Sequence, residues 1–258
     1  MLAGSTPESR PPCPGIPNLP KSRRGTFKEL WGRLFELYTV GLLGEFYPSV
    51  SQMLTPDKKF TNGQIDALLE FGADVFVFEM KASMLTEPAK RLGDRAEFMK
   101  DLILKFVRDN DGKPKGVLQL VNSCTAIENG TVKTATIPTR IYPVLVSDEP
   151  MVESFCFNAH LNEIFQNELG SSIAVQPITA MSVKEFEEVL TCVSQGAFTW
   201  GDLLTSRFNN HGVGPFSVHQ AISDLVQKSK IQLQRSQIIK KTFDEVRSII
   251  SSKYKAQT

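Results

Sequence analysis

Cysteine, histidine and long apolar runs are scarce in this chain of 258 residues, and each scarcity argues against a class of protein. The four cysteines lie far apart without a CxxC pair, which argues against a zinc site and a disulfide framework and favours a reducing compartment. The three histidines are not at metal-ligand spacing. No apolar run approaches the roughly 18 residues of a membrane span, and the N-terminus has no apolar signal core. The sequence therefore predicts a cytoplasmic protein without a membrane segment.

Common catalytic signatures are absent too. The chain has no GxSxG elbow, no GxxxxGK(S/T) phosphate loop, no GxGxxG after an expected strand and no HExxH. Serine hydrolase, nucleotide hydrolase and zinc protease functions therefore have no support. The hydrophobic content of 41% and the charged content of 22% are ordinary for a globular protein, and the length suits one large domain, alone or with an appendage.

Charge is balanced overall but unevenly distributed. The net charge is +1, yet residues 226–258 carry eight basic side chains against two acids, and the N-terminal arm is also basic. Basic ends around an acidic middle can hold a phosphate backbone, and they are equally compatible with solubilising tails. Residues 1–25 are rich in proline, so we expect a disordered arm there.

The stretch from Gln64 to Lys81 is the most informative part of the chain. It predicts strands at 65–71 and 74–81, joined by Gly72-Ala73 in a type II′ turn. In that register Asp66 faces Glu79, with Cβ atoms roughly 4.5–5.5 Å apart. Alternation along the strand places Glu79 and Lys81 on one face. The opposite face takes the apolar residues Phe76, Phe78 and Met80.

Two carboxylates this close repel each other in a half-buried site. A divalent cation removes the repulsion, because Mg²⁺ accepts one or two carboxylates together with waters and phosphate oxygens. A lysine beside them can polarise a water or meet phosphate charge. The alternative is a solvated sheet face with an ion pair from Lys81 to Glu79 or Asp66. Because Glu79 and Lys81 end a strongly apolar strand, we favour the metal site.

Asp66, followed by Glu79-Met80-Lys81 at the end of a hydrophobic strand, resembles the motif of the PD-(D/E)XK nuclease superfamily. The family pattern is an acid on one strand and acid-x-Lys on the next; here Ile65 stands before Asp66 in place of proline. The resemblance implies Mg²⁺ or Mn²⁺ held by Asp66, Glu79 and the main-chain carbonyl of Met80. It also implies that Lys81 orients the attacking water or stabilises the transition state.

Two further residues are candidates through the same resemblance. Glu36 is a lone acid on a helix that is apolar nearly all round from Leu34 to Leu43, and an unpaired acid there is costly. Many family members carry a glutamate on the first helix as an additional metal ligand; a salt bridge is the alternative. Gln119 resembles a glutamine that assists the site in several branches, and a surface glutamine is the alternative.

Apolar periodicity and cap signals predict the remaining elements. Expected helices are 26–46, with an apolar stripe from Phe27 through Trp31 and Tyr38 to Leu42, then 94–110, 113–128, 158–169, 182–195, 199–208, 216–228 and 235–252. Expected strands are an irregular one at 47–54, one at 140–147 in which Pro143 indicates an edge or a bulge, and one at 172–179. A helix-turn-helix around 199–228 is a minor alternative, because its loop is longer than the usual tight turn.

The resulting order of helix, three strands, helix and strand is the core order of the nuclease family. We therefore expect an α/β restriction-endonuclease-like core at 26–180, with a mixed sheet flanked by helices, and a helical C-terminal region at 181–258 packed on it or appended to it. The implied activity is a Mg²⁺- or Mn²⁺-dependent nuclease, more an endonuclease than an exonuclease, with DNA as the favoured substrate.

Two other classes remain open. One is a catalytically silent nuclease-like module that binds nucleic acid or a protein partner. The other is an effector, as in bacterial defence against phage, that stays silent until a partner binds. The N-terminal arm or the C-terminal helices offer a surface for a homodimer or a larger complex.

Overall fold

A computed structural model of the chain describes residues 21–47, 53–61, 63–91, 94–208, 217–233 and 236–255. Its first half contains α1 (Lys21–Phe46), β1 (Met53–Phe60), β2 (Gly63–Phe71), β3 (Asp74–Lys81), α2 (Glu87–Arg91), α3 (Arg95–Leu102), the π-helical turn η1 (Ile103–Val107) and α4 (Gly116–Glu128). The second half contains β4 (Arg140–Ser147), the 3-10 turn η2 (Pro150–Glu153), α5 (Phe155–Leu169), β5 (Thr179–Ser182), α6 (Val183–Ser194), α7 (Trp200–Phe208), α8 (Val218–Ser229) and α9 (Gln237–Lys255).

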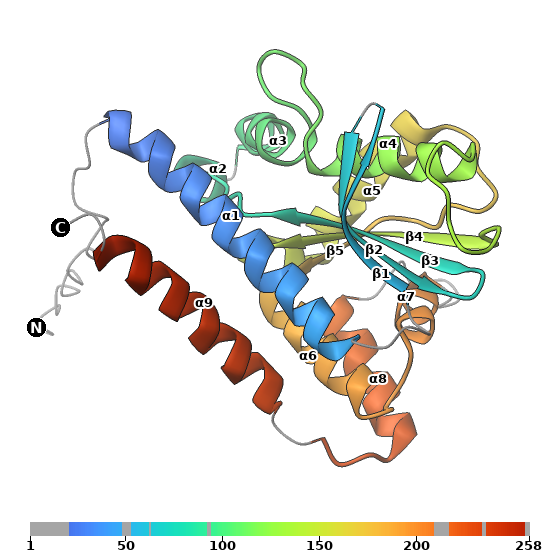
Figure 1. Cartoon of the computed structure of the whole chain (residues 1–258). Helices are drawn as coiled ribbons and strands as arrows, with labels where there is room; N and C mark the ends of the chain where they lie inside the picture. The colour runs from blue at the N-terminus through green and yellow to red at the C-terminus, as the bar shows by residue number, and fades with distance from the viewer. Residues whose placement is uncertain are drawn as a thin grey trace, which may run out of the picture.

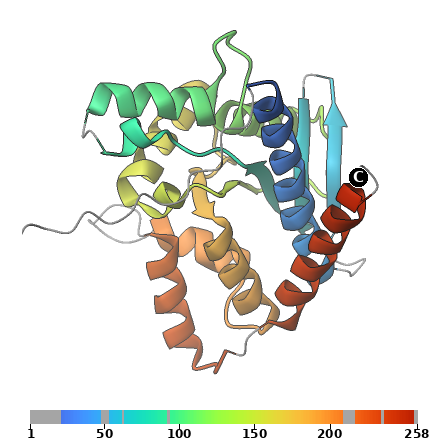
Figure 2. The same ribbon diagram turned by 90° about the vertical axis from the view of Figure 1, so that its left-hand side faces the viewer.

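One mixed sheet organises these elements, with the strands in the order β1-β2-β3-β4-β5. The first three strands are antiparallel neighbours, whereas β3, β4 and β5 run parallel. Helices α1, α6, α7 and α8 share one apolar core with the sheet, and α3, α4 and α5 share the other (Figure 1, Figure 2). The predicted α/β class with a mixed sheet flanked by helices is confirmed.

The central hairpin has the predicted register. Its pairs run from Phe71↔Asp74 to Ala67↔Phe78, and Gly72 has a φ of +61°, as the first central residue of a type II′ turn requires. The predicted division of faces also holds. Phe76, Phe78 and Met80 belong to the core under α1, whereas Val75 and Val77 belong to the core under α4.

Both edge strands lie later in the chain than predicted. The strand expected at 47–54 is Met53–Phe60, while residues 48–52 lie outside the described part. The strand expected at 172–179 is Thr179–Ser182, preceded by a single bridge from Val175 to Ile141. Each edge strand pairs with only one neighbour in the sheet. Which residues form the strand therefore depends on where that neighbour offers backbone groups to pair with, and apolar alternation alone does not locate it.

Pro143 lies in an interior strand, so the predicted edge position is wrong. β4 pairs with β3 on one side and β5 on the other, and Pro143 is opposite Val77. The backbone of Ile141 bonds to residues 174 and 176, and Pro143, two residues further along, has the same orientation. The β5 ladder starts only at Val144↔Thr179. Pro143 therefore falls in a gap of that ladder, where the strand tolerates a residue without an N–H.

The face that α1 buries matches the predicted stripe only in part. Phe27 and Trp31 are 41% and 45% exposed, and Phe35, which lies outside the stripe, is buried in the core over the sheet. Leu42, within the stripe, is buried as predicted. The helix starts at Lys21, earlier than the predicted residue 26. Because its second half is apolar nearly all round, periodicity alone does not select the face that meets the sheet.

Most of the predicted helices are present with shifted ends. Asp94 caps α3, and Ser182 with Glu185 forms the predicted capping box of α6. The loop of the helix-turn-helix alternative, 209–216, and residues 1–20 lie outside the described part. α9 lies along α1, with an ion pair of 3.1 Å from Lys241 to Glu45 (Figure 1). No helix in the described ranges is long and apolar enough to cross a membrane.

Candidate functional site

The candidate site lies where β3 ends. β3 and β4 are parallel and finish together, with Lys81 opposite Ser147. Ligands of open α/β sheets bind outside the carboxyl ends of such strands. Lys81 therefore lies at the carboxyl end of the central strands, where ligands of such sheets are expected to bind.

Asp66 contacts β3 although it lies just beyond the paired part of the hairpin. Counted from the turn, the last pair of the β2–β3 ladder is Ala67↔Phe78, and Asp66 is the next residue on β2. The backbone N–H of Met80 donates a hydrogen bond of 2.7 Å to Asp66 Oδ2. Burial raises the pKa of Asp66 to about 6; this bond lowers it, and the nearby Glu36 carboxylate raises it further. The hydrogen bond fixes one carboxylate oxygen next to β3 and leaves the other free to bind a ligand.

Glu79 is the most deeply buried acid of the group, with 3% of its surface exposed. Burial, and then repulsion from Asp66, raise its pKa well above the ordinary value, while Lys81 acts in the opposite direction. The structure therefore brings Asp66, Glu79 and Lys81 together as the hairpin register predicts. An ionised Glu79 is costly here unless a cation or a proton compensates it.

Two more acids reach the same group from other elements. Glu36 comes from α1; burial and the Asp57 carboxylate raise its pKa, and Arg33 and Lys81 lower it. Asp57 comes from β1, where its φ is +49° and its Oδ1 accepts a hydrogen bond of 3.0 Å from Gln64. The sequence does not single out Asp57, because the expected strand ends at residue 54 and only the observed strand, Met53–Phe60, includes it. We call Glu36, Asp57, Asp66, Glu79 and Lys81 the acid–lysine site.

Gln119 contacts this site through Lys81. Lys81 Nζ lies 3.5 Å from Gln119 Oε1, which also accepts a hydrogen bond of 2.8 Å from the backbone N–H of Gly116. The ammonium group is therefore next to the first turn of α4. A side chain on the fourth helix residue reaches both the helix start and the end of β3, which explains how Gln119 joins the site.

The segment after Lys81 is held rigidly. Ser147 Oγ donates a hydrogen bond of 2.9 Å to the carbonyl of Lys81. Glu149 is fully buried. Its carboxylate accepts a hydrogen bond of 2.7 Å from the N–H of Leu85 and forms an ion pair of 2.8 Å with Lys90. These contacts tie the β3–α2 loop to the end of β4 and fix the main chain on either side of the site.

The acids fit a hard cation in their chemistry. Their oxygen ligands are those that Mg²⁺ and Mn²⁺ prefer, and burial with mutual repulsion raises the pKa of Glu36, Asp66 and Glu79. Within the described ranges, no three His, Cys, Asp or Glu side chains are close enough together to hold a metal ion. The metal roles predicted for Glu36, Asp66, Glu79 and the Met80 carbonyl therefore stay predictions.

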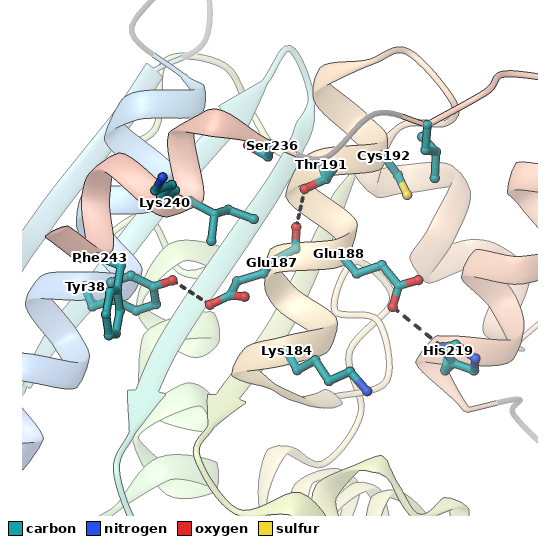
Figure 3. A pocket seen from close by; sticks show the side chains of 12 residues that line it. Tyr38, Lys184, Glu187, Glu188, Thr191, Cys192, His219, Ser236, Lys240 and Phe243 are labelled. Atoms are coloured by element: carbon teal, nitrogen blue, oxygen red, sulfur yellow. Dashed lines mark hydrogen bonds and ion pairs between the residues drawn. The ribbon is translucent and has the colours of Figure 1, made fainter.

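Two large cavities lie away from the acid–lysine site. Each has a volume of about 710 Å³. One is lined by α1, α6, α8 and α9, and there Tyr38 donates a hydrogen bond of 2.5 Å to Glu187 while His219 lies 3.6 Å from Glu188 (Figure 3). The other includes Trp200. No residue of the acid–lysine site lines either cavity.

Comparison with known proteins adds one weak similarity. No family model and no curated protein matches the chain. Among solved structures, the chain is similar to a crystal structure of the small subunit of a heterodimeric restriction endonuclease, with a TM-score of 0.34 and 13% identity. The match covers 81% of this chain and 100% of the other.

Proposed function

We propose that this chain is a metal-dependent nuclease with a restriction-endonuclease-like core that hydrolyses phosphodiester bonds, with DNA as the favoured substrate. One observation carries the proposal. Two neighbouring carboxyl groups, the half-buried Asp66 and the buried Glu79, have raised pKa values beside Lys81 at the carboxyl edge of the sheet. Such an excess of buried negative charge is the environment that a hard cation stabilises.

The residues divide the chemistry between them. Asp66 and Glu79 would hold Mg²⁺ or Mn²⁺, with Glu36 and the Met80 carbonyl as additional ligands. A metal bound there would supply an acidified water and would neutralise charge on the phosphate. Lys81 donates a hydrogen bond to the attacking water or to a phosphate oxygen, and Gln119 orients the Lys81 ammonium group.

The first test is cleavage of circular and linear double-stranded DNA with Mg²⁺ or Mn²⁺. We compare the parent chain with Lys81→Ala, and Lys59→Ala serves as a control because Lys59 is exposed on β1. We expect Lys81→Ala to lose at least about a hundredfold in rate, the scale of a group acting in the transition state. Cutting of the circular substrate identifies an endonuclease. Equal, weak activity in all three proteins indicates a contaminant and refutes the proposal.

A second candidate is a catalytically silent module that binds nucleic acid or a protein partner. The observation in its favour is that no three acids of the described residues are at metal-holding distance. Binding of Mn²⁺ separates the two functions. We expect an active site to bind Mn²⁺ in the parent and to lose it in a double variant, Asp66→Asn with Glu79→Gln. Binding that is absent in the parent favours the silent module.

A further inference from the structure

Three lysines gather beside the acids, on the side of the sheet that α4 covers. Lys115 is the residue before α4, and its Nζ donates a hydrogen bond of 3.1 Å to the carbonyl of Leu104 in η1. That contact brings Lys115 next to Lys105. Lys81 Nζ is joined to the start of α4 through Gln119. We call Lys81, Lys105 and Lys115 the lysine cluster.

The backbone holds Lys115 firmly in this place. Its N–H donates a bond of 2.8 Å to the carbonyl of Val107, at the end of η1. The next residue, Gly116, has a φ of +34°, and a Cβ there would lie 2.6 Å from the carbonyl oxygen of Phe106. The chain thus crosses η1 too closely for a side chain at position 116. Lys115 therefore has little freedom to move away from η1.

Lys115 lies near two like charges, Lys81 and Lys105, and near the acid Asp109. Partial burial lowers the pKa of Lys115; Asp109 raises it, while Lys81 and Lys105 lower it again. Asp109 Oδ1 already accepts hydrogen bonds from the backbone of residues 111 and 113. Among the described residues, no carboxylate lies within ion-pair distance of the lysine cluster. Like charges held near one another cost stability, and an anion bound between them lowers that cost.

The two charged groups sit side by side with opposite signs. Lys81 belongs to both, because it ends β3 next to Glu79 and also lies beside Gln119 at the start of α4. A cation among the acids and an anion among the lysines would be neighbours. A nucleic-acid strand supplies anions at regular spacing, and Lys115 still has two free donors after its bond to Leu104.

We propose that Lys105 and Lys115 form a phosphate subsite beside Lys81, which binds a backbone phosphate of the substrate strand next to the bond that is cut. The inference rests on the proposed nuclease function and assigns positioning residues to it. The subsite fixes the strand in the ground state. Its loss therefore raises KM more than it lowers kcat.

Binding of a short fluorescein-labelled DNA duplex tests the subsite, with Ca²⁺ in place of Mg²⁺ and fluorescence anisotropy as the readout. The variant is Lys115→Gln, which removes the charge and keeps a donor for the Leu104 carbonyl. The matched control is Lys113→Gln, on the same loop and exposed. One phosphate contact contributes about eightfold in affinity near 0.1 M salt, from a counterion slope of about 0.9.

We expect Lys115→Gln to bind the duplex about fivefold to tenfold more weakly than the parent, with a salt slope lower by about one. Lys105→Gln should act in the same direction, and Lys115→Arg should restore binding. Lys113→Gln should match the parent. Thermal unfolding of each variant checks that its fold is intact.

The outcomes separate the subsite from the nuclease function. If the parent cuts DNA while Lys115→Gln and Lys113→Gln bind equally well with the same salt slope, the subsite is wrong and the nuclease stands. If the parent neither binds nor cuts DNA, both are overturned. If Lys115→Gln lowers kcat with KM unchanged, the residue acts in the transition state and the ground-state role is refuted.

Discussion

The half-buried carboxyl group of Asp66 makes metal-free stability depend on pH in an unusual direction. Its pKa rises from 3.8 to about 6 on folding. The folded protein therefore binds this proton more tightly than the unfolded chain does. The contribution of Asp66 to stability is most favourable below pH 4 and is lost as the pH rises through 6. The difference amounts to at most about 3 kcal/mol at pH 8, from 1.36 kcal/mol per unit of pKa.

Asp66→Asn removes that dependence. The amide oxygen can still accept the hydrogen bond from Met80, but it carries no charge. With EDTA present, we expect the variant to match the parent near pH 4 and to exceed its free energy of unfolding by up to about 3 kcal/mol at pH 8.

Urea unfolding followed by circular dichroism, between pH 4 and pH 8, measures the effect. Asp111→Asn is the control, because Asp111 is an exposed aspartate on the turn before α4. We expect this control to follow the parent curve at every pH. If Asp66→Asn also follows the parent curve, or is less stable than the parent at pH 8, the reasoning about buried charge is refuted.

Two further predictions concern the scaffold around the site. Gly116→Ala should lower the free energy of unfolding by about 1–3 kcal/mol, because the added Cβ would meet the Phe106 carbonyl. Gly32→Ala on α1 should raise the free energy of unfolding by about 0.5–1 kcal/mol, because the space around Gly32 is open. Equal effects of the two substitutions would contradict the close crossing. Glu149→Ala should cost about 3–5 kcal/mol, since it leaves Lys90 without its buried partner. Urea unfolding measures both, and a loss below about 1 kcal/mol would contradict the role of Glu149.

Local signals in the sequence were sufficient for the central hairpin. Gly72-Ala73 forms the turn and so fixes which residues of the two strands pair. The regular alternation of side chains along β3 then determines which of them face each core. The same holds for α6, whose Ser182–Glu185 capping box is complete within four residues. Such features are predictable because every group involved lies close in sequence.

Features that depend on distant partners were not predictable in this way. The exposed face of α1, the interior place of Pro143 and the late start of β5 follow from which elements meet in space. The positions of Asp57 and Lys115 also depend on distant partners. Each approaches the site from a separate segment, through a left-handed residue on β1 or a close crossing of η1.

The α/β class, the central hairpin and the contact of Asp66 with the Glu79–Lys81 strand can be predicted from local signals, because turn chemistry and strand alternation are local. Glu36 and Asp57 approach the same acids, and Lys105 and Lys115 gather on the other side of Lys81, only in the folded chain. Charges that are far apart in sequence become neighbours only when the helices pack on the sheet. Their mutual energies depend on that packing and on the burial that accompanies it.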